Sequence, residues 1–182
     1  MSTLSLCVYC GARPGAKPAY EAAGTALGEA IAKEGWRLIY GAGDVGIMGA
    51  VAAAAVAGGA DTLGVIPTHL VQSEAPRDIY GSDRIITETM HERKKVMFMN
   101  ADATAVLPGG AGSLEEFFEV LTWSQLNLHD KPIFLVDIEG YWQPLVALLD
   151  HVVAEGFADA SLKGLFQVVP DVETLVSSLK KG

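Results

Sequence analysis

Cysteine and positive charge are both scarce in this chain of 182 residues. The two cysteines, Cys7 and Cys10, are too few for a disulfide scaffold and fit a reducing compartment. Their C-x-x-C spacing allows a redox motif. However, both lie in or just after an apolar strand rather than at a helix amino end, which favours two small, partly buried residues. With 13 basic against 22 acidic residues, the overall field does not attract nucleic acid, so any phosphate must be held by a local site.

Long apolar runs are absent as well. No run reaches the ~18 residues that a membrane span needs, and the amino terminus lacks a basic segment followed by an apolar core. We therefore expect no contact with a membrane, no secretory signal and a cytoplasmic location. Half of the residues are hydrophobic and 19% are charged, a composition typical of one folded domain, here residues 1–182.

Short apolar runs alternate with helical patterns from end to end. This alternation predicts an α/β, Rossmann-like, doubly wound and mainly parallel sheet of about seven strands, with helices on both faces. Strands are expected at Leu4–Tyr9, Arg37–Tyr40, Thr62–Ile66, Arg84–Thr87, Ala103–Leu107, Pro132–Val136 and Phe166–Val169. Helices are expected at Pro18–Glu34, Ile47–Ala57, Met90–Asn100, Ser113–Leu126, Tyr141–Glu155 and Val172–Lys180. The longest irregular stretch, Pro67–Asp83, has a length often found in functional lids.

Three glycine-bearing turns follow strands, at the edge where such folds bind ligands. The first begins at Gly11, the second runs from Gly41 to Gly49, and the third is Pro108–Gly112. The third links a strand to a helix amino end, whose free N–H groups favour phosphate. The second matches G-x-G-x-x-G, but it follows the second strand and lacks a suitably placed acidic residue, so we expect no nicotinamide cofactor.

Two charged residues are candidates for catalysis, and each has a simpler interpretation. Arg93 shares a partly apolar helical stripe with Met90 and Met97, so it is either an ordinary surface arginine or one pinned by a carboxylate or phosphate. Glu116 could face a phosphate-bound ligand, but its spacing from Ser113 favours a capping box.

The neighbouring charged residues leave similar choices open. Glu115 has the same ambiguity as Glu116, and Glu119 is expected on a solvated face. At least one of Lys94 and Lys95 is expected in solvent. The histidines are scattered, so no metal site is expected.

The pairing of Met90-His91-Glu92-Arg93-Lys94 with the segment 108–116, Pro-Gly-Gly-Ala-Gly-Ser-Leu-Glu-Glu, resembles the LOG family of cytokinin riboside 5'-monophosphate phosphoribohydrolases. The resemblance covers nearly the whole chain. It implies a homodimer or a larger assembly of dimers, a nucleotide substrate, no cofactor, and hydrolysis of an N-glycosidic bond. By position, Arg93 and Glu116 match the family's catalytic pair. Expected contacts to the substrate and its phosphate are Gly109, Gly110, Gly112, Ser113, Glu115, Met90, Lys94, Gly11, Gly41, Gly43, Gly46 and Met48.

The chain departs from the family pattern in three places. Ser113 replaces a threonine and keeps a hydroxyl. Ala42 replaces a common glycine, which could restrict the backbone of the second turn. Ala12 and Arg13 replace a pair of serines, and Arg13 adds a possible partner for phosphate.

Cleavage of a ribosyl–base bond builds positive charge on the sugar, which a carboxylate stabilises. Glu116 would supply it, while Arg93 would bind phosphate or ribose and hold Glu116 ionised. A nucleotide-binding module or sensor without turnover is the alternative. A decarboxylase would need a pyridoxal phosphate lysine, and no sequence context marks Lys94 or Lys95 as one. The preferred base, isopentenylated adenine or plain adenine, stays open.

Overall fold

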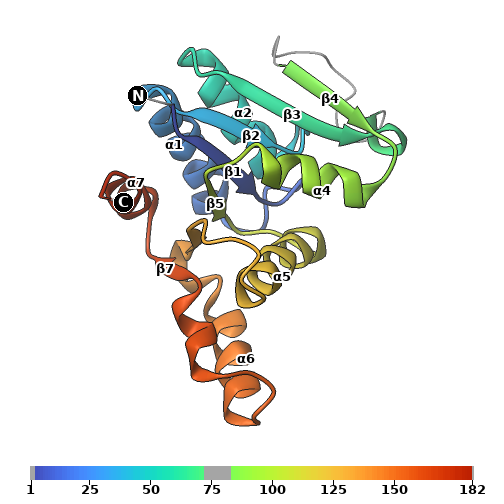
Figure 1. Cartoon of the computed structure of the whole chain (residues 1–182). Helices are drawn as coiled ribbons and strands as arrows, with labels where there is room; N and C mark the ends of the chain where they lie inside the picture. The colour runs from blue at the N-terminus through green and yellow to red at the C-terminus, as the bar shows by residue number, and fades with distance from the viewer. Residues whose placement is uncertain (1–2, 72–82, 182) are drawn as a thin grey trace.

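The computed structural model describes residues 3–71 and 83–181 (Figure 1). Its strands are β1 (Ser5–Tyr9), β2 (Arg37–Tyr40), β3 (Thr62–Pro67), β4 (Asp83–Thr87), β5 (Ala103–Val106), β6 (Ile133–Val136) and β7 (Gln167–Val169). Its α-helices are α1 (Pro18–Lys33), α2 (Gly46–Ala57), α4 (Met90–Met99), α5 (Ala111–Gln125), α6 (Gln143–Ala154) and α7 (Val172–Leu179). Short 3₁₀ helices are η1 (Thr68–Leu70), η2 (Ile138–Gly140) and η3 (Ala160–Gly164).

The described strands form one seven-stranded sheet in the order β4-β3-β2-β1-β5-β6-β7. Each neighbouring pair is parallel. The chain thus runs from β1 toward one edge and then returns to build the other edge from β5. This confirms the predicted doubly wound α/β fold.

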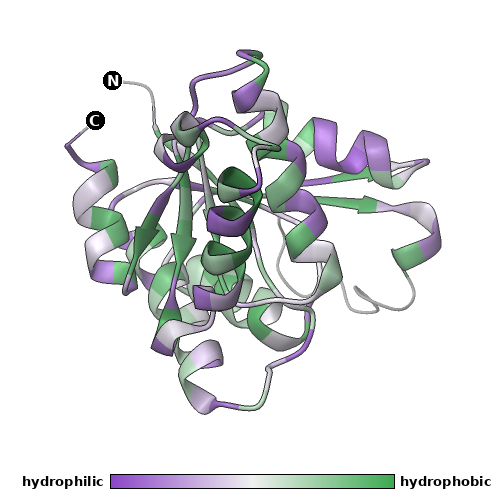
Figure 2. Ribbon diagram, turned by 90° about the horizontal axis from the view of Figure 1, so that it is seen from below, coloured by the Kyte–Doolittle hydropathy of each residue, from purple (hydrophilic) through white to green (hydrophobic). Residues whose placement is uncertain are grey.

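Alternate residues of the strands face opposite sides of the sheet. Leu6 and Val8 belong to one core with α1, α2 and α7, while Cys7 and Tyr9 belong to a second core with α4, α5 and α6. Helices therefore cover both faces, as predicted. Figure 2 shows hydrophobic colour concentrated on the central strands, while the helices carry both hydrophobic and hydrophilic colour. Strands buried on both faces read as apolar runs, which is why the sequence reveals them.

The reversal of strand order places a crevice between the ends of β1 and β5. The loops after these two strands touch there, because the Gly11 N–H donates to the Pro108 carbonyl oxygen at 3.0 Å. The N–H of Met48, in the first turn of α2, donates to the Gly11 carbonyl oxygen at 3.2 Å. Three glycine-bearing turns thus converge at one edge of the sheet, as the sequence predicted.

The predicted bounds hold to within two residues for the helices and strands listed above. Ser113–Leu126 shows one of the largest differences, because α5 begins earlier, at Ala111. Most of the irregular stretch Pro67–Asp83 lies outside the described residues. Among the helices of the described part, none is both long and apolar enough to cross a bilayer.

Candidate active site

A cavity of about 320 Å³ opens between the loop after β1 and the amino ends of α4 and α5. We call it the Arg93–Glu116 cavity. Most of the predicted site residues line it. These are Gly11, Met48, Met90, Arg93, Gly110, Gly112, Ser113, Glu115 and Glu116. The sequence analysis thus brought together residues from four separate segments of the chain.

The amino end of α5 forms one wall of this cavity. Gly110 is the N-cap residue and its helix end has no side-chain cap. A Cβ at Gly110 or at Gly112 would meet no atom within 4 Å. The backbone is therefore open at these two glycines, and the first N–H groups of a helix without a side-chain cap favour an anion.

The predicted capping box of Ser113 and Glu116 is wrong. Because α5 begins at Ala111, Ser113 already lies inside the first turn, where it is buried. Glu116 lies one turn further along and lines the cavity. The capping interpretation, which competed with a functional role for Glu116, is thereby removed.

The turn before α5 is also held by Tyr141, which follows η2. The Tyr141 hydroxyl donates to the Gly109 carbonyl oxygen at 2.6 Å. A Cβ at Gly109 would lie 2.1 Å from the Ser113 Oγ atom. Gly109 therefore packs behind the turn and holds its shape, while Gly110 and Gly112 face the cavity.

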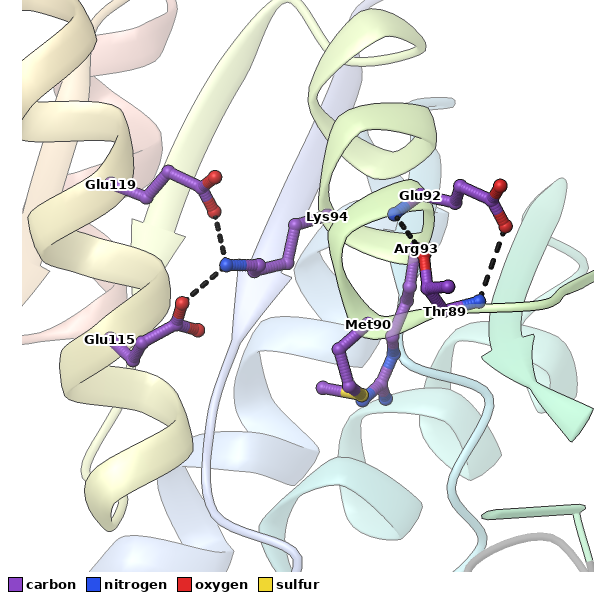
Figure 3. Close-up of polar contacts among 7 residues, drawn as sticks. All are labelled: Thr89, Met90, Glu92, Arg93, Lys94, Glu115 and Glu119. Atoms are coloured by element: carbon purple, nitrogen blue, oxygen red, sulfur yellow. Dashed lines mark hydrogen bonds and ion pairs between the residues drawn. The ribbon is translucent and has the colours of Figure 1, made fainter. Parts of the chain in front are cut away.

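Arg93 is buried, with 4% of its surface exposed, so it is not an ordinary surface arginine. Its Nε donates to the Val65 carbonyl oxygen at 3.0 Å and its Nη2 to the Gly41 carbonyl oxygen at 2.8 Å. Its Nη1 lies 3.9 Å from the Met90 sulfur, and Figure 3 shows these two side chains together. Backbone carbonyls thus fix the guanidinium in the cavity wall, where it needs no rearrangement to meet a ligand.

The first turn of α4 sets the position of Arg93. Thr89 and Glu92 form a capping box, with the Glu92 N–H donating to the Thr89 Oγ1 at 3.2 Å (Figure 3). The Thr89 N–H donates in return to the Glu92 Oε2 at 3.2 Å. The capping box fixes the start of α4 at Met90 and therefore also the position of Arg93 relative to the sheet.

The glycines of the turn between β2 and α2 allow protein groups next to the cavity to pack closely. A Cβ at Gly41 would lie 2.0 Å from the Arg93 Nη2. Gly46 has a φ of +62°, and a Cβ there would lie 2.5 Å from the backbone of Ala12. The Gly43 N–H points at the Met48 sulfur, 3.2 Å away. These three glycines, predicted as ligand contacts, are not among the residues that line the cavity.

Lys94 also lies outside the cavity lining and spans the gap between α4 and α5 (Figure 3). Its Nζ donates to the Glu115 carboxylate and lies 2.6 Å from the Glu119 Oε2. Burial by itself would lower the pKa of Lys94, but the hydrogen bonds that its ammonium donates to Glu115 and Glu119 outweigh this effect, so the pKa is raised. The expectation of a solvated Glu119 is wrong, whereas Lys95 is exposed as predicted.

Cys7 and Cys10 are free and buried. Burial raises the pKa of both thiols well above the ordinary range, so both stay protonated near neutral pH. That environment agrees with two small buried residues rather than with a reactive pair. Among residues 3–71 and 83–181, no group of three or more His, Cys, Asp or Glu residues could hold a metal ion.

Three of the residues that line the cavity, Cys10, Ala12 and Leu70, were not predicted to contact the substrate. Arg13 also lines the cavity, and it was expected as a possible partner for phosphate. Leu70 belongs to η1, in a stretch without periodicity, so no sequence signal could identify it. Its apolar side chain joins Met48 and Met90 in the lining of the cavity.

Comparison with known proteins agrees with this geometry. A family model described as "Possible lysine decarboxylase" matches residues 48–179. The chain is 39% identical over 176 residues to "Probable cytokinin riboside 5'-monophosphate phosphoribohydrolase LOGL1" from Oryza sativa subsp. japonica, which covers 97% of this chain and 78% of that protein. The chain belongs to the LOG family.

A second relative and two solved structures extend the comparison. LOG3 of Arabidopsis thaliana, a cytokinin riboside 5'-monophosphate phosphoribohydrolase, is 38% identical over 97% of this chain and 81% of its own. The molybdenum cofactor binding protein of Rippkaea orientalis superposes with a TM-score of 0.76 at 22% identity, over 100% of this chain and 98% of its own. The Moco carrier protein of Chlamydomonas reinhardtii gives 0.74 at 20% identity, over 99% and 97%. Since both structures fall below 25% identity, they establish the fold of this LOG-family chain and nothing further.

Proposed function

We propose that this protein hydrolyses the N-glycosidic bond of adenosine 5'-monophosphates, plain or modified at N6, and releases the free base and ribose 5-phosphate. One observation carries the proposal. Gly110 and Gly112, which can receive an anion, and the carboxylate-bearing Glu116 line a single cavity from a single helix. The relatives named as phosphoribohydrolases support it, because they match nearly the whole chain.

The phosphate end of the substrate would lie at the amino end of α5. Open space around Gly110 and Gly112 lets a phosphate reach the backbone N–H groups, and the helix dipole favours its charge. The buried Ser113 hydroxyl lines the same end. Binding energy from the phosphate would then hold the sugar in place for the reaction.

The reacting end of the substrate would lie at Glu116. Glu116 is four residues beyond Gly112, which places it about 6 Å further along the helix axis. A carboxylate there stabilises positive charge on the sugar and accepts a proton from the attacking water. The water oxygen bonds to C1', and the base leaves with the electron pair of the C1'–N bond and then takes up the proton.

Arg93 would act through its fixed positive charge. Its guanidinium lines the cavity and is held by the Val65 and Gly41 carbonyl oxygens. From there it would attract the phosphate or ribose and favour the ionised form of Glu116. A preorganised cation of this kind lowers the barrier without having to move during the reaction.

The decarboxylase description of the family model is not supported by the lysines of this chain. A Schiff-base lysine needs a lowered pKa so that its amine is free to attack. The pKa of Lys94 is raised, and its ammonium is paired with Glu115 and Glu119. Lys95 is exposed on the surface of α4. A pure nucleotide sensor remains the competing function, and the test below separates it from an enzyme.

We further propose that residues 1–182 form one domain and that the protein works in the cytoplasm as a homodimer, alone or in a larger assembly of dimers. One continuous sheet containing strands from both ends of the chain supports a single domain. Exposed apolar side chains near the ends of α4 and α5 (Met99, Leu126 and Leu128) offer a surface for a second copy. Light scattering after size exclusion should give at least twice the monomer mass, and a monomer would contradict the dimer.

Base release tests the activity. Purified wild type is incubated with AMP and with isopentenyladenosine 5'-monophosphate, beside Glu116→Gln, Arg93→Ala and the exposed control Glu173→Gln on α7. Wild type and control should release base, while Glu116→Gln loses about 10³-fold or more and keeps its melting temperature. The ratio of the two substrate rates identifies the preferred base. A folded wild type that binds AMP but releases no base would overturn the enzyme and leave the sensor.

A further inference from the structure

A second cavity, of about 310 Å³, adjoins the first at the β1–β5 crevice. Its wall includes Tyr20 of α1 and Ile47 of α2, which pack with the core on the face opposite α4 and α5, and Tyr141, which packs against both cores. We call it the Tyr20–Tyr141 cavity. The proposed activity uses none of these three side chains, so this cavity is free to bind a further group.

The two cavities meet at a shared boundary. Gly11, Arg13 and Gly110 line both of them. Arg13 is exposed, and no ion pair found among the described residues includes it. A Cβ at Gly110 would meet no atom within 4 Å, so the space beside its Cα is open. An anion at this boundary would therefore meet both the amino end of α5 and a guanidinium that can form a forked contact.

The order of groups in the first cavity decides which part of a ligand enters the second. The phosphate lies at Gly110 and Gly112, the sugar at Glu116, and the base extends toward the apolar Met90 and Leu70. This order rests on the proposed function. The boundary lies at the phosphate end, so only a group joined to the phosphate can pass into the Tyr20–Tyr141 cavity, and a substituent on the base cannot.

The lining of the second cavity indicates the chemistry of that group. The Tyr20 and Tyr141 rings meet edge to face with centroids 5.4 Å apart, and Ile47 adds an apolar surface. Rings and aliphatic side chains suit a planar, largely apolar group such as a nucleobase. The crevice where strand order reverses is also where doubly wound sheets hold two joined nucleotides.

We infer that the Tyr20–Tyr141 cavity binds the second half of a pyrophosphate-linked dinucleotide, with Arg13 on the second phosphate. The first half occupies the Arg93–Glu116 cavity in place of the mononucleotide. The chain would thus have two classes of nucleotide ligand, one hydrolysed as a monophosphate and one bound across the crevice.

Binding of AMP, ADP and diadenosine 5',5'-diphosphate is measured by calorimetry in a Glu116→Gln background, which prevents turnover. The dinucleotide should bind at least about tenfold more tightly than ADP. Ala16→Trp, which fills the second cavity, should abolish that gain and leave AMP and ADP unchanged. The matched control Ala22→Trp, on the exposed face of α1 outside the cavity, should change nothing. Arg13→Ser should weaken ADP and the dinucleotide severalfold more than AMP.

Two results would overturn the inference: a dinucleotide that binds no more tightly than ADP, or a gain that survives Ala16→Trp. Failure of the proposed function looks different. In that case wild type releases no base from AMP, whatever the dinucleotide does. A gain that depends on Ala16 would then still support the second cavity as a binding site.

Discussion

Two glycine-rich turns at the same edge of the sheet use glycine for different purposes. In the turn between β2 and α2, a Cβ at Gly41 would lie 2.0 Å from the Arg93 Nη2, and one at Gly46 would overlap the loop after β1. In the turn that leads into α5, a Cβ at Gly110 or Gly112 would meet no atom within 4 Å. In the first turn, glycine lets protein groups pack closely, whereas Gly110 and Gly112 of the second turn leave the cavity side of the backbone open.

The comparison shows what a glycine motif can and cannot predict. The G-x-G-x-x-G match falls on the turn between β2 and α2, which we call the supporting turn. The turn itself lines neither cavity, although residues of α2, the helix that follows it, do. The turn that leads into α5, which we call the receiving turn, matches no dinucleotide motif. Spacing predicts a tight turn in both cases, but only the surrounding atoms reveal whether the open side faces protein or ligand. Substitutions that add a single Cβ therefore separate the two turns experimentally.

Gly46→Ala should have the largest effect on stability, a loss of about 3 kcal/mol in urea unfolding. The φ of +62° adds strain of about 1 kcal/mol, and the overlap with backbone 2.5 Å away adds about 2 kcal/mol more. Gly35→Ala is the matched control, because its φ is +67° and no atom lies within 4 Å. It should lose only the strain, and equal losses in both variants would contradict a supporting role for Gly46.

The receiving turn has support of its own from Lys94, which ties α4 to α5. Lys94→Met should lower the free energy of unfolding by about 2 kcal/mol, because it leaves Glu119 partly buried without its cation. Lys95→Met, at the exposed neighbouring position, should change stability by less than about 0.5 kcal/mol. Similar losses in the two variants would show that the buried pairs contribute nothing.

The difference in stability between wild type and Lys94→Met should depend on pH, because the pKa of Lys94 is raised in the folded state. The folded state holds this proton more tightly than the unfolded state. The contribution is therefore fully present below the ordinary lysine pKa of about 10.4 and is lost as the pH rises through the folded value. The stability gap between wild type and Lys94→Met should stay constant from pH 7 to 9 and narrow above about pH 10.4. A stability gap that already closes between pH 7 and 9 would show that the gap depends on the titration of another group.

Gly112→Ala tests the receiving turn directly. The added methyl meets no protein atom, and alanine favours the helix by up to about 1 kcal/mol, so stability should hold or rise. The KM for AMP should nevertheless increase about tenfold, because the methyl keeps the phosphate from the backbone N–H groups. An unchanged KM would mean that the phosphate binds elsewhere.

The smallest effect is expected at Ala42, a non-glycine residue at φ +58° in the supporting turn. Ala42→Gly should raise stability by about 0.5 kcal/mol, since relief of about 1 kcal/mol of strain exceeds the added chain entropy of the unfolded state. The same urea experiment measures it. A loss of 1 kcal/mol or more would show that the contact of Ala42 with Ile66 and its neighbours outweighs the strain.

The sequence predicts the sheet well because each buried parallel strand is a short apolar run that ends at a turn. The expected Arg37–Tyr40 is β2 as observed, and the expected Thr62–Ile66 is shorter than β3 by one residue. The start of α5 was harder to predict from the sequence, because Gly112 has a low helix propensity and is typical of a turn. That error produced the incorrect capping box at Ser113 and Glu116.

The contacts that shape the site depend on tertiary neighbours and could not be predicted. Lys94 is buried only because α5 places Glu115 and Glu119 opposite it. The sequence left Arg93 open between an ordinary surface arginine and one pinned by a carboxylate or phosphate. Its hydrogen bonds to the Val65 and Gly41 carbonyl oxygens could not be predicted, because backbone groups carry no side-chain signal. Residue identity predicted which groups gather at the site, and packing determined which of them face the ligand.

We propose that the turn into α5 receives the 5'-phosphate and so places the sugar at Glu116. The most direct test is the ratio of kcat/KM for AMP to kcat/KM for adenosine, in wild type and in Gly112→Ala. We expect wild type to prefer AMP by about 10³-fold or more, and the preference to fall about tenfold in Gly112→Ala with adenosine turnover unchanged. Comparable turnover of AMP and adenosine in wild type, or an undiminished preference in the variant, would contradict the account.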